Sequence, residues 1–130
     1  MSAVANGSRP VVVLVVEDEW LVRRYIADFL HEAGCVVIEA DSGERAIYLC
    51  NSGMPIDVLF TDINLNASTD GWVVAETFRE ARDNIPVIYA SGNPIDPTRC
   101  VPGSLCFDKP YQPTDILRAC VRLKEASPTR

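Results

Sequence analysis

The sequence lacks the long apolar run that a membrane-spanning helix needs. Its longest uninterrupted run, Val11–Val16, leads directly into acidic residues, and a helix that crosses a bilayer takes about 20 apolar residues. Basic residues are also scarce, because 12 Lys and Arg stand against 18 Asp and Glu, for a net charge of −6. Contacts to nucleic-acid phosphates need a basic face. We therefore expect a cytoplasmic protein that binds neither a membrane nor nucleic acid directly.

Paired cysteines of a disulfide framework or a zinc site are absent as well. The chain has five cysteines, an odd number, and none stands in a Cys-x-x-Cys pair. Free cysteine usually behaves as a small hydrophobic residue. We expect reduced, buried thiols at Cys35, Cys50, Cys100, Cys106 and Cys120.

Length and composition suit one globular domain. The chain has 130 residues, of which 48% are hydrophobic and 23% charged, close to the averages of globular proteins. We expect a domain at 11–124, between a flexible N-terminal tail at 1–10 and a C-terminal tail at 125–130. This division leaves no effector domain, so we expect the domain to stand alone.

Short apolar runs alternate with helical patterns along the chain. The runs are rich in Val, Ile and aromatic residues, as strands are, and several are apolar at successive positions, as in strands covered on both faces. The predicted strands are Val11–Val16, Val36–Ala40, Val58–Asp62, Pro86–Ser91 and Leu105–Asp108. This pattern favours a parallel sheet.

Helical spacing fills most intervals between these strands. Gly34 is placed to end the first helix, Ser42 and Asp70 are placed to cap the next two, and Pro113 suits the first turn of the last. Alternating strands and helices predict an α/β fold, a flavodoxin-like doubly wound five-stranded parallel sheet of order 2-1-3-4-5. Three prolines between Gly92 and Gly103 predict a fourth helix that is short or absent.

Polar residues follow four of the predicted strands: Glu17 and Asp18, then Asp62, Ser91 and Lys109. Such residues meet at one edge of a parallel sheet. Three carboxylates within ~4–6 Å repel by roughly 3–4 kcal/mol per pair at an effective dielectric of about 20. Magnesium, as Mg²⁺, prefers oxygen ligands and would relieve this repulsion. Since aspartate is an established phosphoryl acceptor, Asp62 is the candidate acceptor, with Lys109 and Ser91 on the phosphoryl oxygens.

These residues belong to four motifs in register. They are Val-Val-Glu-Asp-Glu at 15–19, Phe-Thr-Asp-Ile at 60–63, Tyr-Ala-Ser-Gly at 89–92 and Asp-Lys-Pro-Tyr at 108–111. In this order and spacing they resemble the receiver domains of bacterial response regulators, over about 11–123. The resemblance implies that Asp62 is the phosphoacceptor, that Asp18 binds Mg²⁺ directly, that Glu17 acts through water, and that Asn64 supplies its backbone carbonyl.

The same resemblance implies a switch and a signalling role. Ser91 matches the hydroxyl residue of the switch, and Lys109 matches the family's lysine, whose bond to Pro110 is usually cis. The implied function is that of a stand-alone receiver that accepts a phosphoryl group from a histidine kinase or histidine phosphotransfer protein. It then signals to an unknown downstream protein through a changed binding surface. It would be no enzyme, since it catalyses only its own phosphorylation and dephosphorylation. A domain of a larger hybrid kinase is the alternative to a free-standing chain.

Two departures qualify the resemblance. Cys106 stands where many receivers carry an aromatic switch residue. Tyr-Ala-Ser-Gly and the prolines after it resemble an atypical branch with a Phe-Ala-Thr-Gly-like motif and a degenerate fourth helix. We therefore expect the segment from Gly92 to Gly103 to carry the conformational response.

Other interpretations remain open. A phosphatase with Asp62 as nucleophile would want a second acid at position 64, which is Asn. A pseudo-receiver would bind partners without phosphorylation. Among single residues, Trp20 and Trp72 are expected to pack beside the site loops, and His31 to lie on the surface at a helix end.

Overall fold

A computed structural model describes residues 9–126 and contains one five-stranded sheet of order β2-β1-β3-β4-β5. All four pairings are parallel. The strands are β1 (Val12–Val16), β2 (Val36–Ala40), β3 (Val58–Asp62), β4 (Val87–Ser91) and β5 (Leu105–Asp108). The predicted fold class and strand order are confirmed, with strand bounds within one residue of the prediction.

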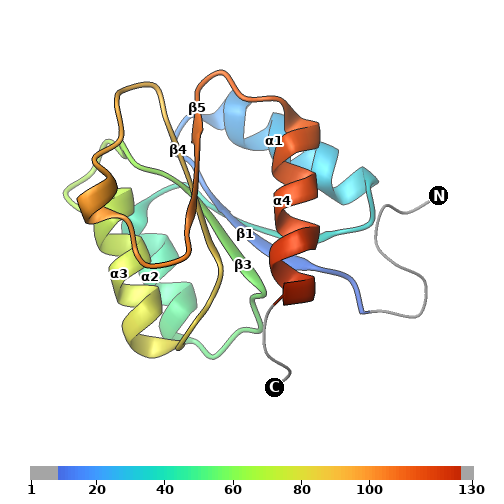
Figure 1. Ribbon diagram of the computed structural model, residues 1–130, viewed down its shortest axis with the longest axis horizontal. Helices are drawn as coiled ribbons and strands as arrows, with labels where there is room; N and C mark the ends of the chain where they lie inside the picture. Colours follow the sequence, from blue (N-terminus) through green and yellow to red (C-terminus); the bar gives the residue numbers. More distant parts are fainter. Residues whose placement is uncertain (1–8, 127–130) are drawn as a thin grey trace.

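Helices cover both faces of the sheet. They are α1 (Trp20–Glu32), α2 (Gly43–Asn51), α3 (Gly71–Ala81) and α4 (Pro113–Ala126). Helices α1 and α4 lie on one face, and α2 and α3 on the other (Figure 1). Successive strand residues therefore enter different cores: Leu14 and Val16 pack with α2 and α3, while Val13 and Val15 pack with α1 and α4. This double coverage explains why the strands are apolar at successive positions.

The helix boundaries follow from the capping residues. Oγ of Ser42 accepts a hydrogen bond from the backbone N–H of Arg45 at 3.0 Å, and Asp70 does the same for Val73 at 3.1 Å. Gly34 follows α1 with a φ of 100°, a left-handed conformation that favours glycine. Ser42 and Asp70 thus set where α2 and α3 begin, after the carboxyl ends of β2 and β3, and Gly34 sets where α1 ends, before β2.

The fourth helix is reduced to one short turn, η1 (Pro97–Arg99), as the prolines predict. The turn is held against α3, since the Arg99 guanidinium lies 5.1 Å from the Trp72 ring centroid. The backbone N–H of Val101 donates to the hydroxyl of Tyr89 at 3.1 Å. The connection between β4 and β5 is therefore anchored although it is largely irregular.

Two expectations about burial were wrong. Cys106 is exposed and Cys100 only half-buried, whereas the other three thiols are buried as predicted. β5 is an edge strand whose Leu105 and Phe107 face α4, so Cys106 faces the side that a regular fourth helix would cover. Trp20 is likewise 62% exposed, whereas Trp72 is packed.

The ends of the domain differ slightly from the prediction. Helix α4 continues to Ala126, so the predicted C-terminal tail at 125–130 begins with helical residues. The predicted N-terminal tail at 1–10 falls mostly on residues 1–8, which lie outside the described residues, as do 127–130. Within 9–126, no helix is long and apolar enough to cross a membrane.

Candidate functional site

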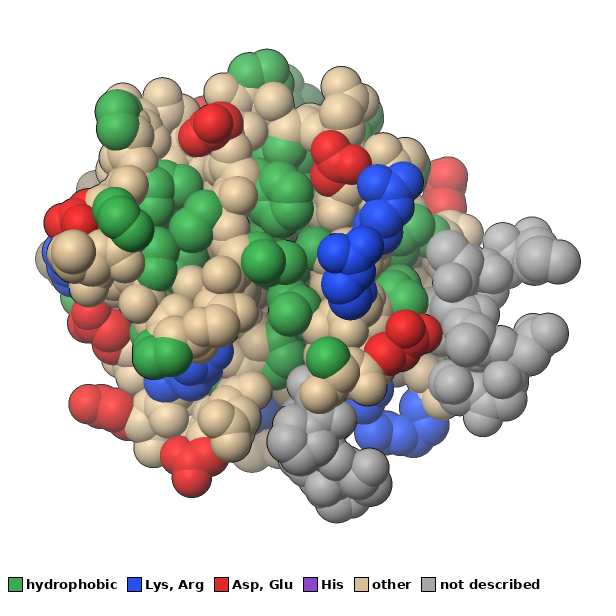
Figure 2. All heavy atoms as spheres, viewed as in Figure 1, with side chains coloured by type: hydrophobic (Ala, Val, Ile, Leu, Met, Phe, Trp, Pro, Cys, Tyr) green, Lys and Arg blue, Asp and Glu red, His purple; other side chains and the backbone are tan. Residues whose placement is uncertain are grey.

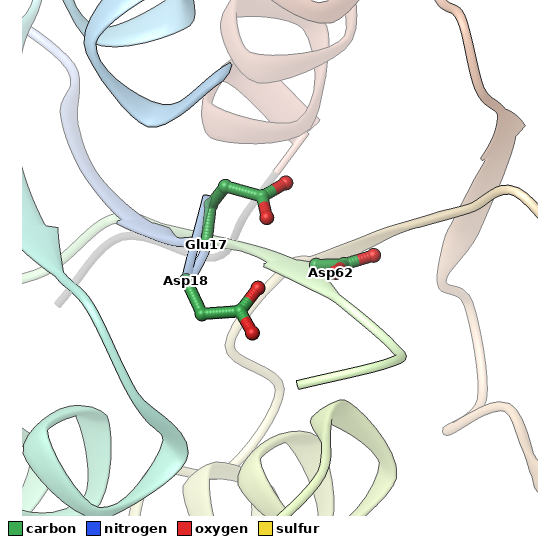
Figure 3. Close-up of side chains that lie close together, drawn as sticks. All are labelled: Glu17, Asp18 and Asp62. Atoms are coloured by element: carbon green, nitrogen blue, oxygen red, sulfur yellow. The ribbon is translucent and has the colours of Figure 1, made fainter. Parts of the chain in front are cut away.

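Three carboxylates from two neighbouring strands meet at the carboxyl edge of the sheet. Glu17 and Asp18 directly follow β1, and Asp62 ends β3. Each offers a carboxylate oxygen, and these three oxygens lie within 4.8 Å of one another. Figure 3 shows the three side chains directed into one space beyond the strand ends. The parallel pairing of β1 with β3 places them there.

Lys109 is the cation that faces this cluster. Its Nζ lies 2.7 Å from Oε1 of Glu17 and 3.3 Å from Oδ1 of Asp62. The backbone N–H of Lys109 donates to the carbonyl of Ser91 at 2.8 Å, which fixes the loop after β5 beside β4. The bond to Pro110 is cis, as expected. The lysine predicted from the sequence therefore lies against two of the three predicted acids.

The site remains electrostatically unbalanced. Burial raises the pKa of Glu17. The hydrogen bond from Lys109 opposes this rise, and the negative charge of Asp62 adds to it. Burial also raises the pKa of Asp62, with the charge of Asp18 acting in the same direction and Lys109 opposing it. Burial disfavours the charge of Lys109, but its bonds to the two acids outweigh burial and raise its pKa. Three carboxylates share one ammonium group, so an added cation is favoured here.

Ser91 belongs to the same edge and is connected to the loop after Asp62. Its Oγ accepts hydrogen bonds from Nδ2 of Asn64 at 3.1 Å and from the backbone N–H of Asn93 at 3.0 Å. The side chain of Asn64 thus contacts the predicted switch hydroxyl. The predicted role of its backbone carbonyl as a metal ligand stays a prediction. These two bonds link the acceptor loop to the segment that follows β4.

Gly71 is a site-shaping residue that the sequence reasoning missed. A Cβ added there would lie 2.1 Å from the carbonyl oxygen of Asp62, closer than real contacts allow. Its N–H donates to the carbonyl of Ile63 at 2.8 Å. The start of α3 is therefore packed directly on the backbone of the acceptor. The pair Asp70-Gly71, a cap followed by a residue without a side chain, was the available signal.

The donors present fit a hard divalent cation. Carboxylate oxygens are the ligands that Mg²⁺ prefers, and no cysteine or histidine belongs to the cluster. One oxygen of Asp18 accepts the N–H of Asn66 at 2.9 Å, and one oxygen of Glu17 faces Lys109. The other oxygen of Glu17 accepts the N–H of Glu19 at 3.1 Å, so both Glu17 oxygens already have donors. Asp18 offers a second oxygen to a metal without losing its bond to Asn66.

Comparison with known proteins decides the family. A sequence model of the response regulator receiver domain matches residues 13–119. The chain belongs to the response regulator receiver family. The prediction made from the four motifs is confirmed.

Relatives of this receiver occur in two settings. The rice two-component response regulator ORR11 is 31% identical, over 95% of this chain and 88% of its own length. The sensor histidine kinase RcsC of Salmonella typhimurium is 26% identical over 88% of this chain, which spans only 12% of that kinase. A response regulator receiver protein from Sinorhizobium medicae has a similar structure, with a TM-score of 0.87, 32% identity and coverage of 91% of this chain and 97% of that one.

An apolar groove opens beside the receiver's acidic cluster. It is lined by Glu19, Leu21, Val22, Tyr25, Lys109, Pro110 and Tyr111. On its α1 side, Leu21 is 74% and Tyr25 61% exposed. Lys109 lines the groove and also contacts Glu17 and Asp62, so the groove adjoins the acidic cluster. The sequence reasoning gave the apolar positions of α1 no role at a surface and missed this groove.

Proposed function

We propose that this receiver accepts a phosphoryl group on Asp62 from a histidine kinase or histidine phosphotransfer protein. The observation that carries the proposal is the position of the Asp62 carboxylate, which lies within the three-acid cluster and 3.3 Å from Nζ of Lys109. A carboxylate with a neighbouring fixed cation and room for a second one is suited to attack an anionic phosphoryl group.

In the transfer, a carboxylate oxygen of Asp62 attacks phosphorus. The bond from phosphorus to the donor's imidazole nitrogen breaks as the bond to the Asp62 oxygen forms, and the electron pair stays on the imidazole. Attack by water on the aspartyl phosphate later releases phosphate. The receiver therefore has no separate substrate, and it is a phosphoacceptor that promotes its own modification.

Acidic residues would hold the metal for this reaction. Glu17, Asp18, Asp62 and the backbone carbonyl of Asn64 are the proposed ligands of Mg²⁺. When bound, Mg²⁺ would neutralise charge on the transferred group. Lys109 already contacts Glu17 and Asp62, and we assign it to a phosphoryl oxygen after transfer. Ser91, 2% exposed at the end of β4, would donate its hydroxyl to another.

We place the phosphoryl donor at the groove beside α1. The groove adjoins the acceptor, because Lys109 lines the groove and its Nζ lies 3.3 Å from Oδ1 of Asp62. Its apolar lining suits an amphipathic helix, which would lay its apolar face against Leu21 and Tyr25. The donor's histidine would then project toward Asp62. We also propose that the receiver acts in the cytoplasm and that its signal passes to a downstream protein.

The test is phosphorylation by a small donor, with no kinase present. Wild type incubated with Mg²⁺ and acetyl phosphate should gain the mass of one phosphoryl group, located on Asp62 by peptide mapping. Asp62→Asn should gain none, and omission of Mg²⁺ should abolish the gain in wild type. Asp41→Asn, which removes an exposed carboxylate after β2, is the matched control and should react as wild type does.

Two results would contradict the proposal. An equal mass gain in Asp62→Asn would place the acceptor elsewhere. A folded wild type that takes up no phosphoryl group from acetyl phosphate and does not bind beryllofluoride would favour a pseudo-receiver, the alternative that binds partners without phosphorylation.

A further inference from the structure

Two cysteine thiols meet on the side of β5 that the short fourth helix leaves uncovered. Sγ of Cys100 and Sγ of Cys106 lie 3.5 Å apart. Cys100 directly follows η1 and is half-buried, and Cys106 lies on β5 and is exposed. Figure 2 shows hydrophobic side chains, the class that includes cysteine, at the surface over β5 and the connection before it. An oxidant in solution therefore has access to the pair.

The backbone conformation brings Cys100 and Cys106 together. Between the cysteines the chain makes a turn in which the N–H of Ser104 donates to the carbonyl of Val101 at 3.2 Å, and Gly103 has a φ of 77°. Val101 is held by the hydroxyl of Tyr89, and Tyr89 is the register partner of Cys106 in the pairing of β4 with β5. Both sides of the thiol contact are thus fixed to the same buried tyrosine.

We propose that Cys100 and Cys106 form an oxidation site, at which hydrogen peroxide converts the two thiols into an intramolecular disulfide. One sulfur, as thiolate, attacks a peroxide oxygen, so that a sulfenic acid forms and hydroxide leaves. The second sulfur attacks the sulfenic sulfur, and water leaves. Two thiols lose two electrons and the peroxide gains them, giving one disulfide and two waters in total.

The geometry requires only a small movement. A disulfide has a sulfur–sulfur distance of about 2.05 Å, so the sulfurs must approach by about 1.5 Å from their present 3.5 Å. The exposed side chain of Cys106 has room to rotate. Burial and the contact with Cys100 raise the pKa of Cys106 to about 11, so this thiol stays protonated near neutral pH. Cys100 is therefore assigned to the attack on peroxide and Cys106 to the second step. Closure of the disulfide should be slow at pH 7 and faster in alkaline solution, because the thiolate of Cys106 is the nucleophile of that step.

The bond would restrict the segment that follows the predicted switch. Residues 92–99 run from Ser91, at the end of β4, to Cys100. In the reduced protein this segment is anchored at its far end mainly by non-covalent contacts of Arg99 and Val101. The disulfide would join that end covalently to β5 and remove conformations in which η1 separates from the sheet. This inference does not depend on phosphorylation of Asp62.

Peroxide treatment of the purified full chain tests the inference. With hydrogen peroxide, wild type and Asp62→Asn should both lose the mass of two hydrogen atoms, and non-reducing peptide mapping should find one link, between Cys100 and Cys106. Dithiothreitol should restore the original mass. In Cys106→Ser, which changes an exposed side chain, the link cannot form, and dimedone labelling of the Cys100 sulfenic acid should rise several-fold over wild type. Cys35→Ser, at a buried position, is the control and should form the link.

Amide hydrogen exchange adds an independent measurement. Exchange at 93–105 should slow on oxidation in wild type and remain unchanged in Cys106→Ser. The inference is overturned if peroxide yields dimers linked through Cys106, or sulfinic acid on Cys106 with no internal link. It is equally overturned if dimedone labels Cys100 as strongly in wild type as in Cys106→Ser.

Discussion

A buried aspartate faces a lysine at each end of β3, but only one of the two ends is balanced in charge. Asp57, just before the strand, is bound by Nζ of Lys124 at 3.0 Å and by the N–H of Val12 at 2.9 Å. Asp62, at the other end, shares Nζ of Lys109 with Glu17. Both aspartates are buried and both face a lysine. Only the first pair is balanced, with one carboxylate for one ammonium group.

The difference lies in the number of charges rather than in the residue types. At the Asp57 end, both carboxylate oxygens have donors, and the pair joins α4 to the sheet. At the Asp62 end, three acids face one lysine, and burial raises the pKa of both Glu17 and Asp62. One end of the strand thus stabilises the fold, while the other has an excess of negative charge that an added cation would balance.

The largest expected effect comes from a methyl group placed behind the acceptor. In Gly71→Ala the new Cβ would meet the carbonyl of Asp62 at 2.1 Å, and such overpacking costs about 3 kcal/mol at a site backed by main chain. Urea unfolding should show this loss, and phosphorylation by acetyl phosphate should slow. Gly92→Ala, where a Cβ meets nothing within 4 Å, should do neither. A Gly71→Ala protein as stable and as reactive as wild type would show that the start of α3 can move away from the backbone of Asp62 at no cost.

Isosteric removal of one charge at each end tests the comparison directly. Asp57→Asn weakens two bonds to a buried carboxylate and should lower the free energy of unfolding by about 2 kcal/mol. Asp62→Asn removes repulsion and should raise it by up to about 1 kcal/mol in metal-free buffer. Urea unfolding in EDTA measures both. An equal loss in the free energy of unfolding in both variants would contradict the conclusion that only the Asp57 end is balanced in charge.

The pH dependence should show the same contrast. Because the pKa of Asp62 is raised by folding, the folded state binds more protons than the unfolded state, so this group's contribution to stability falls as pH rises above about 3.8. The stability gained in Asp62→Asn should therefore be small near pH 3.5 and full near pH 7. Unfolding curves of both proteins across this range, in EDTA, measure the difference. A gain that is constant with pH would mean that charge is not its cause.

The smallest expected effect concerns the connection from the site to η1. Ser91→Ala removes the acceptor of the bonds from Asn64 and Asn93 but none of the acidic residues. Asp62 should stay phosphorylatable, while the change in amide exchange at 92–103 after phosphorylation should become smaller than in wild type. Thr98→Ala, on the same segment and away from the site, is the control and should keep the wild-type response.

Much of the fold was predictable because local signals determine it. Strand runs, the caps at Ser42 and Asp70, and the glycine at 34 were all read correctly, since each acts within a few residues of its own position. The meeting of Glu17, Asp18 and Asp62 was also predictable. Parallel strands bring their carboxyl ends to one edge whatever the details of packing, so three strand-end acids had to become neighbours.

The sequence by itself determined the order of the elements, the edge on which the site lies and the residue types that form it. Only the tertiary structure decided the contacts between elements: the bond from Lys109 to Glu17, the close approach of Gly71 to Asp62, and the meeting of Cys100 with Cys106. The expectation of a buried Cys106 was wrong for the same reason, because the exposure of an edge strand depends on what covers it. Periodicity and capping act over a few residues, whereas these contacts depend on how whole elements pack, which no short stretch of sequence encodes.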